Sequence, residues 1–151
     1  MAHKTPLFDA HVAAGGKMID FAGWMMPVNY GSQIEEHTAV RTDAGMFDVS
    51  HMTIVDIDGP DAENFLRKVI ANDVTVLAEY QALYGAALNA HGGILDDLIV
   101  YRLPKGFRVV VNASTREKML DWFDAQSMTN MRIEHKSQVM LAVQGPEAIN
   151  K

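Results

Sequence analysis

Two adjacent aspartates, Asp96 and Asp97, are the residues whose type and spacing first suggest chemistry. They open an apolar stretch in the segment GGILDDLIVY. Acidic residues are poor strand formers, so two of them at the head of a strand require a reason. Neighbouring strand residues point to opposite faces, and the pair therefore cannot share one proton as two facing carboxylates do. One aspartate can face a cleft while the other faces solvent or a turn amide.

Strand alternation divides this segment between two faces. One face carries Leu95, Asp97, Ile99 and Tyr101, and the other carries Asp96, Leu98 and Val100. A carboxylate that shares a face with a tyrosine suits recognition of a flat polar heterocycle. On pattern alone, the reading in which the acids cap a turn or are simply solvated is favoured.

Few other residues form a pattern that indicates chemistry. The six histidines include no i, i+4 pair and no HExxH sequence, so no metal site is expected. Ser50-His51 lacks the G-x-S-x-G context of a hydrolase nucleophile. Asn112 follows the apolar run Val109-Val110-Val111 and is either a turn residue, which is favoured, or a side-chain amide offered to a ligand.

Composition excludes several classes of protein. The chain has 151 residues with 13 Lys and Arg against 19 Asp and Glu, a net charge of −6. This balance argues against nucleic-acid and anionic-membrane partners, which require clustered basic residues. The absence of cysteine excludes disulfides and thiolate metal sites. No apolar run approaches the ~18–20 residues of a membrane helix, and the first residues do not resemble a signal or transit peptide. We therefore expect a cytoplasmic protein.

Caps and periodicity predict three helices. Ser32-Gln33-Ile34-Glu35 and Ser114-Thr115-Arg116-Glu117 both read as capping boxes. The first helix is expected to run to about Ala44 and to end at a left-handed Gly45. A further helix is expected to start at Pro60, because apolar residues follow at helical spacing. These residues are Ala62, Phe65, Leu66, Val69 and Ile70.

Strands are predicted between the helices, and several are joined by hairpin-length turns. The expected ranges are 52–57, 83–88, 95–103, 107–111 and 139–143. Direct strand-to-strand turns favour antiparallel pairing. The predicted fold class is α+β, with an antiparallel or mixed sheet covered by helices.

One short pattern occurs twice. A strand leads into Gly59-Pro60-Asp61-Ala62-Glu63-Asn64, and a second strand leads into Gly145-Pro146-Glu147-Ala148-Ile149-Asn150. The first copy continues into a full helix, whereas the second reaches the last residue after one turn. Because a helix is not stable as a first turn alone, we expect the chain to be a truncated piece of a longer protein.

Long segments of the sequence resemble a known family. They are DFAGWMMPVNYGSQIEEHTAVRTDAGMFDVSHM, GGILDDLIVY and VVVNAST. They resemble the N-terminal part of the aminomethyltransferases, the T-proteins of the glycine cleavage system, within the folate-binding T-protein-like superfamily. The resemblance extends over essentially the whole chain, so that residues 1–151 are expected to form the N-terminal part of the folate-binding region. The KGCYxGQE signature of the iron–sulfur-assembly branch is absent.

The resemblance implies a transfer reaction. The methylene of an aminomethyl group, carried on the lipoyl arm of the partner H-protein, passes to the co-substrate tetrahydrofolate, and ammonia is released. The essential aspartate of the family corresponds to Asp96-Asp97, and Asp97 is favoured because its face also carries Tyr101. The folate-binding residues implied by the resemblance are Met52, Thr53, Tyr84, Asp97, Tyr101, Val111 and Asn112.

Three alternatives follow for function. The first is an aminomethyltransferase whose activity is impaired here, because the C-terminal half of the family is missing from the chain. The second is a relative that binds folate without catalysis, or a folate-dependent demethylating relative of the sarcosine and dimethylglycine type. The third is an α+β interaction domain in which the aspartates cap a turn. The resemblance favours the first.

Overall fold

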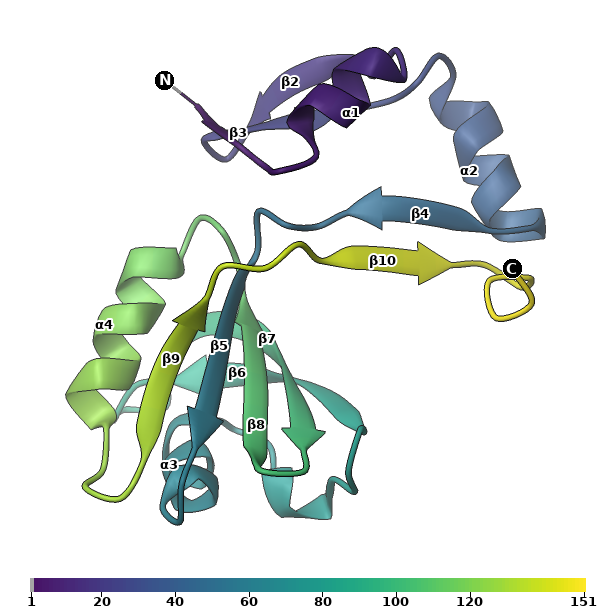
Figure 1. Ribbon diagram of the computed structural model, residues 1–151. Coiled ribbons are helices and arrows are strands. Elements are labelled where there is room, and N and C mark those ends of the chain that lie inside the picture. Colours follow the sequence, from purple (N-terminus) through teal and green to yellow (C-terminus); the bar gives the residue numbers. More distant parts are fainter. Residues whose placement is uncertain (1) are drawn as a thin grey trace. The chain divides into compact units, whose positions relative to one another are not determined.

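A computed structural model describes residues 2–151 and divides them into two compact units. Unit 1 comprises the chain up to His51 together with Gln138–Lys151, and unit 2 comprises Met52–Ser137. Helices and strands occur in both units, as Figure 1 shows. The predicted α+β class is confirmed, and both antiparallel and parallel strand pairs are present.

Unit 2 is built on a five-stranded antiparallel sheet in the order β6-β7-β8-β5-β9. The strands are β5 (Thr53–Asp58), β6 (Ala82–Leu88), β7 (Ile94–Leu103), β8 (Gly106–Val111) and β9 (Arg132–Lys136). The turn between β7 and β8 requires Gly106, which has a φ of +150° and approaches the Ile57 carbonyl closely. Of these strands, β9 was not predicted from the sequence.

Helices α3 (Ala62–Val69) and α4 (Arg116–Gln126) supply the apolar side chains that bury one face of this sheet. The rings of Phe65 and Phe123 meet edge to face with their centroids 5.8 Å apart. Both side chains are fully buried against sheet residues such as Val55 and Val109. This covered face holds the hydrophobic core of unit 2. A short 3-10 helix, η1 (Val74–Val76), adds the buried Val74.

The alternation predicted along β7 is confirmed except at its start. Asp96, Leu98 and Val100 are buried on the covered face, whereas Asp97 is exposed on the other. The register between β6 and β7 shifts next to Leu88, which pairs with Ile94. Leu95 therefore falls out of the alternation and packs against the core instead of lying beside Asp97.

Unit 1 contains two small sheets and two helices. Strands β1 (His3–Lys4), β3 (Trp24–Pro27) and β2 (Met18–Phe21) form one sheet, in which β1 and β3 are parallel. Strand β4 (Gly45–Asp48) pairs antiparallel with β10 (Leu141–Gln144). The helices are α1 (Phe8–Ala13) and α2 (Gln33–Thr42). Only α2 and β10 among these elements were predicted.

The predicted helix ends are partly wrong. Ser32 does cap α2, because its Oγ accepts from the Glu35 amide at 3.3 Å. However, α2 ends at Thr42 and Gly45 is the first residue of β4, without a left-handed conformation. Glycine avoids a close contact there, because a Cβ would lie 2.3 Å from Cγ2 of Val40 and the valine side chain would have to move.

The other two helices also begin later than predicted. Helix α3 starts at Ala62, two residues after Pro60. Helix α4 starts at Arg116 after Thr115, and no side chain caps it, so the capping box predicted at Ser114 is wrong. Thr115, not Ser114, occupies the position before the helix, and its hydroxyl donates to Asp96.

The Gly-Pro pattern that occurs twice in the sequence also has a common geometry. Gly59 and Gly145 have φ values of +110° and +130°, and a Cβ on either would lie within 2.4 Å of a backbone oxygen. Two residues later, the amides of Asp61 and Glu147 donate to the carbonyls of Asn130 and Asp43. In each copy the glycine follows the end of a strand and packs against the residues just before the antiparallel partner strand.

No helix within residues 2–151 is long and apolar enough to span a membrane.

Candidate functional site

One end of the unit 2 sheet brings together most of the residues predicted to bind a ligand. Antiparallel pairing places the start of β5 beside the end of β8, where Thr53 pairs with Val111. The end of β8 lies in turn beside the start of β7, where Val111 pairs with Leu98. Consequently Asp97, Asn112 and Met52, although distant in sequence, lie at the same end of one sheet.

Asp97 is exposed at this end and is held by two neighbours. The Tyr84 hydroxyl donates to its Oδ2 at 2.7 Å, and the Asn112 side-chain amide donates to its Oδ1 at 3.0 Å. The hydrogen bond from Tyr84, with that from Asn112, lowers the pKa of Asp97 below its usual value. The same contact raises the pKa of Tyr84. At neutral pH the pair is therefore a carboxylate and a protonated phenol.

Asp96 occupies a different environment, although it is the next residue. It is buried on the covered face. Its Oδ2 accepts from Thr115 Oγ1 at 2.5 Å and from the Asn112 backbone amide at 3.3 Å, and its Oδ1 accepts from Asn112 Nδ2 at 2.9 Å. A buried carboxylate is costly unless it is hydrogen-bonded, and these contacts satisfy it. The exposed carboxylate available to a ligand is that of Asp97.

The remaining predicted residues are placed less uniformly. Tyr101 is half-buried further along β7, opposite Ala82. Thr53 and Val111 have no exposed surface, because their side chains lie on the covered face. Thr53 accepts a hydrogen bond from Arg116 Nε at 2.8 Å. The structure thus joins Asp97, Tyr84 and Asn112 directly, while Thr53 and Val111 lie beneath them.

The first turn of α4 also contributes to this end of the sheet, and the sequence interpretation missed it. Thr115 bonds to Asp96, Arg116 bonds to Thr53, and Lys118 Nζ donates to the Leu95 carbonyl. Two cations in the first turn of a helix oppose its dipole. The unfavourable position of Arg116 and Lys118 is the feature of the sequence that could have indicated that they contact the sheet.

Unit 1 contains a second group of polar residues, which centres on Asp48. The Asp48 side chain is fully buried, and its Oδ2 accepts from Thr5 Oγ1 at 2.7 Å and from His11 Nε2 at 2.9 Å. The other ring nitrogen of His11 lies 2.5 Å from the Tyr30 hydroxyl. Burial alone would raise the pKa of Asp48, but the hydrogen bonds from Ser50, His11 and Thr5 outweigh it and lower the pKa.

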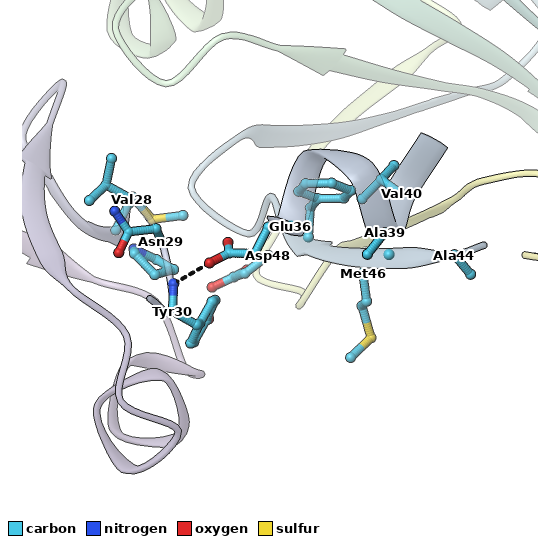
Figure 2. Close-up of a pocket in the computed structure, with 13 residues that line it drawn as sticks. Val28, Asn29, Tyr30, Glu36, Ala39, Val40, Ala44, Met46 and Asp48 are labelled. Atoms are coloured by element: carbon cyan, nitrogen blue, oxygen red, sulfur yellow. Dashed lines mark hydrogen bonds between the residues drawn. The ribbon is translucent and has the colours of Figure 1, made fainter. Parts of the chain in front are cut away.

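A cavity of about 350 Å³ lies next to this group, and Figure 2 shows the residues that line it. Its wall includes apolar residues of β3, α2 and β4 together with Glu36, which accepts from the Tyr30 amide at 2.7 Å. Burial, Asp48 and Glu36 raise the pKa of Tyr30, so the phenol stays protonated at neutral pH. None of the predicted folate contacts lines this cavity.

Histidine, aspartate and glutamate side chains do not gather into a group of three or more that could hold a metal ion anywhere in residues 2–151.

Comparison with known proteins gives consistent matches. The family model described as the GCVT N-terminal domain matches residues 7–150. Curated proteins named aminomethyltransferase from Chromobacterium violaceum and Alcanivorax borkumensis are 56% and 55% identical, and each match covers 98% of this chain. The solved glycine cleavage system aminomethyltransferase T from Bartonella henselae matches with a TM-score of 0.93 and 35% identity over 99% of the chain. The chain spans 42% of the length of each of these proteins.

Proposed function

Because the chain belongs to the GCVT N-terminal domain family, we propose that it forms the N-terminal part of the folate-binding region of an aminomethyltransferase. The reaction passes the methylene of an aminomethyl group from the lipoyl arm of H-protein to tetrahydrofolate. Lipoylated H-protein and tetrahydrofolate are therefore the proposed partners. The observation that carries the proposal is an exposed Asp97 carboxylate whose two oxygens accept hydrogen bonds from Tyr84 and Asn112.

The proposed reaction balances without a metal or an external oxidant. Two bonds form, from the methylene carbon to N5 and N10 of tetrahydrofolate. Two bonds break, from the same carbon to the amine nitrogen and to the lipoyl sulfur. The hydrogens of N5 and N10 leave with the products, which are ammonia, the free thiol and 5,10-methylenetetrahydrofolate.

Asp97 acts on this reaction through its charge. Exchange of one nitrogen for another at the methylene carbon passes through cationic, iminium-like species. A fixed carboxylate near that carbon stabilises the developing positive charge and orients the attacking folate nitrogen. Tyr84 and Asn112 occupy both carboxylate oxygens of Asp97, so they fix its direction before substrate arrives. Tyr101, on the same strand, supplies an aromatic surface for the pterin ring.

The test is a calorimetric titration of the chain with 5-formyltetrahydrofolate. We expect Asp97→Asn to bind the folate roughly 10- to 100-fold more weakly, the effect of losing a hydrogen bond to a charged group. Asp121→Asn is the matched control, because Asp121 is an exposed aspartate on α4. Unchanged affinity in Asp97→Asn, or an equal loss in both variants, would contradict the proposed role.

Dependence on H-protein separates the transferase from its alternatives. In a longer parent protein that contains this region, we expect turnover to require lipoylated H-protein and to fall when Asp97 is replaced by Asn. A protein that binds folate but whose folate chemistry is indifferent to lipoylated H-protein would instead be a regulatory or demethylating relative.

A further inference from the structure

The residue that precedes α4 makes a contact that does not serve its own helix. A threonine in this position normally accepts a hydrogen bond from the helix backbone and thereby caps the helix. Thr115 makes no such bond, and its hydroxyl donates to the buried Asp96 at 2.5 Å instead. Helix α4 therefore has no side-chain cap, and the Thr115 hydroxyl contacts Asp96 on β7.

Asp96, which accepts from Thr115, also accepts hydrogen bonds from Asn112. Its two carboxylate oxygens accept the backbone amide and the side-chain amide of Asn112 at 3.3 and 2.9 Å. Asp96 is only 7% exposed, so water does not compete strongly for these positions. The two contacts fix both the end of β8 and the direction of the Asn112 side chain.

Asn112 in turn reaches the exposed carboxylate. The same Nδ2 that bonds to Asp96 lies 3.0 Å from Asp97 Oδ1 and 3.1 Å from the Asp97 carbonyl. Tyr84 from β6 holds the other carboxylate oxygen of Asp97. A continuous chain of hydrogen bonds therefore runs from the start of α4, through the interior of unit 2, to the side chain that the proposed function places at the reacting carbon.

We propose that Thr115 is a positioning residue of the folate site, and that its hydroxyl, through Asp96 and Asn112, sets the orientation of the Asp97 carboxylate. This inference rests on the proposed function for its biological meaning, but not for its test. Arg116 and Lys118, which bond to Thr53 and to the Leu95 carbonyl, fix the same helix turn against the sheet. The titratable group that faces Asp97 is Tyr84 from β6, whereas Asp96 lies on the opposite face of β7 and acts through its charge on Tyr84.

The test compares Thr115→Val, which keeps the shape but loses the hydroxyl, with Thr115→Ser, which keeps the hydroxyl. The side-chain carboxyl carbon of Asp97 is followed by NMR as the pH is lowered, without any folate present. In Thr115→Val we expect the midpoint to move upward toward that of an ordinary aspartate, because Asp96 loses the Thr115 hydrogen bond, orients Asn112 less firmly, and Asn112 then stabilises the charged form of Asp97 less. Thr115→Ser should titrate as the parent chain does.

A second readout is the affinity for 5-formyltetrahydrofolate, which should fall roughly three- to tenfold in Thr115→Val and recover in Thr115→Ser. An unchanged Asp97 midpoint in Thr115→Val would overturn the inference. Loss of cooperative unfolding in Thr115→Val would also overturn it, because the hydroxyl would then serve the fold itself. A shifted midpoint in a chain whose parent binds no folate would leave the positioning role intact and count against the proposed function alone.

Discussion

At the scale of single residues, Asp96 and Asp97 show how one position in a strand separates two roles. The carboxylate of Asp96 is buried and accepts hydrogen bonds at both oxygens. The carboxylate of Asp97 is exposed and is held by Tyr84 and Asn112. Strand alternation predicted that the two side chains point to opposite faces, but not which of them is buried. The donors that satisfy Asp96 could not be predicted, because Thr115 reaches it only after α4 has packed on the sheet.

The two aspartates should therefore differ in their contribution to stability. Asp96→Ala removes the acceptor of the Asn112 backbone amide and the shorter of the two hydrogen bonds of the Thr115 hydroxyl, so we expect the free energy of unfolding to fall by about 2–4 kcal/mol. Asp97→Ala removes exposed contacts only and should cost less than about 1 kcal/mol. Urea unfolding of a Trp24→Phe background, followed by the fluorescence of Trp122 in unit 2, measures both. Equal losses would show that Asp96 is not held as described.

At the scale of elements, the strongest sequence signals belonged to elements with a continuous apolar face. Helix α3 was predicted because Phe65, Leu66 and Val69 recur at helical spacing, and all are buried in the structure. Strand β9 was missed because its sequence, RIEHK, is mostly charged and it pairs with β5, which is distant along the chain. Strand β4 was missed for the same kind of reason, since its partner is β10. Long-range pairing decided these strands, not local preference.

Gly59, in the first copy of the repeated Gly-Pro motif, should be sensitive to substitution. Gly59→Ala would place a Cβ 2.4 Å from the Asn130 carbonyl oxygen at a φ of +110°, so we expect a loss of about 2–4 kcal/mol. Gly92→Ala is the control, because Gly92 also has a positive φ but has nothing within 4 Å of the added carbon. It should cost about 1 kcal/mol. If thermal unfolding shows the same loss of stability in both variants, the close approach to the Asn130 carbonyl is not the reason for glycine at position 59.

The Asp48 group ties three segments of unit 1 together, namely α1, the chain before α2, and β4. Because hydrogen bonds from Ser50, His11 and Thr5 lower the pKa of Asp48 despite its burial, the stabilisation is present above the usual aspartate pKa. It is lost as the pH falls through the lowered value, below about pH 4.

Asp48→Asn should therefore destabilise unit 1 by about 1–3 kcal/mol at pH 7, and the difference from the parent chain should shrink as the solution is acidified. Trp24 fluorescence in a Trp122→Phe background reports on unit 1 during urea unfolding. Asp9→Asn, at an aspartate on α1, is the control. If the difference in unfolding free energy between Asp48→Asn and the parent chain grew toward low pH, the hydrogen bonds would not be lowering the pKa of Asp48.

For the whole molecule, the sequence predicted the fold class, four of the five strands of the unit 2 sheet and the family, because all three depend on long segments with distinctive residues. The chain spans 42% of the length of these relatives. The two-unit organisation was not foreseen. It arises because the last strand, β10, returns to pair with β4, and so encloses unit 2 within the sequence of unit 1.

We propose that folate binds at the Asp97 end of the unit 2 sheet. The most direct measurement is an amide NMR titration of the chain with 5-formyltetrahydrofolate. We predict saturable shifts at Asp97, Tyr101, Asn112 and Met52, with little change at residues that line the cavity beside Tyr30. Shifts confined to that cavity, or no shifts at concentrations that saturate a folate site, would show that folate does not bind at Asp97.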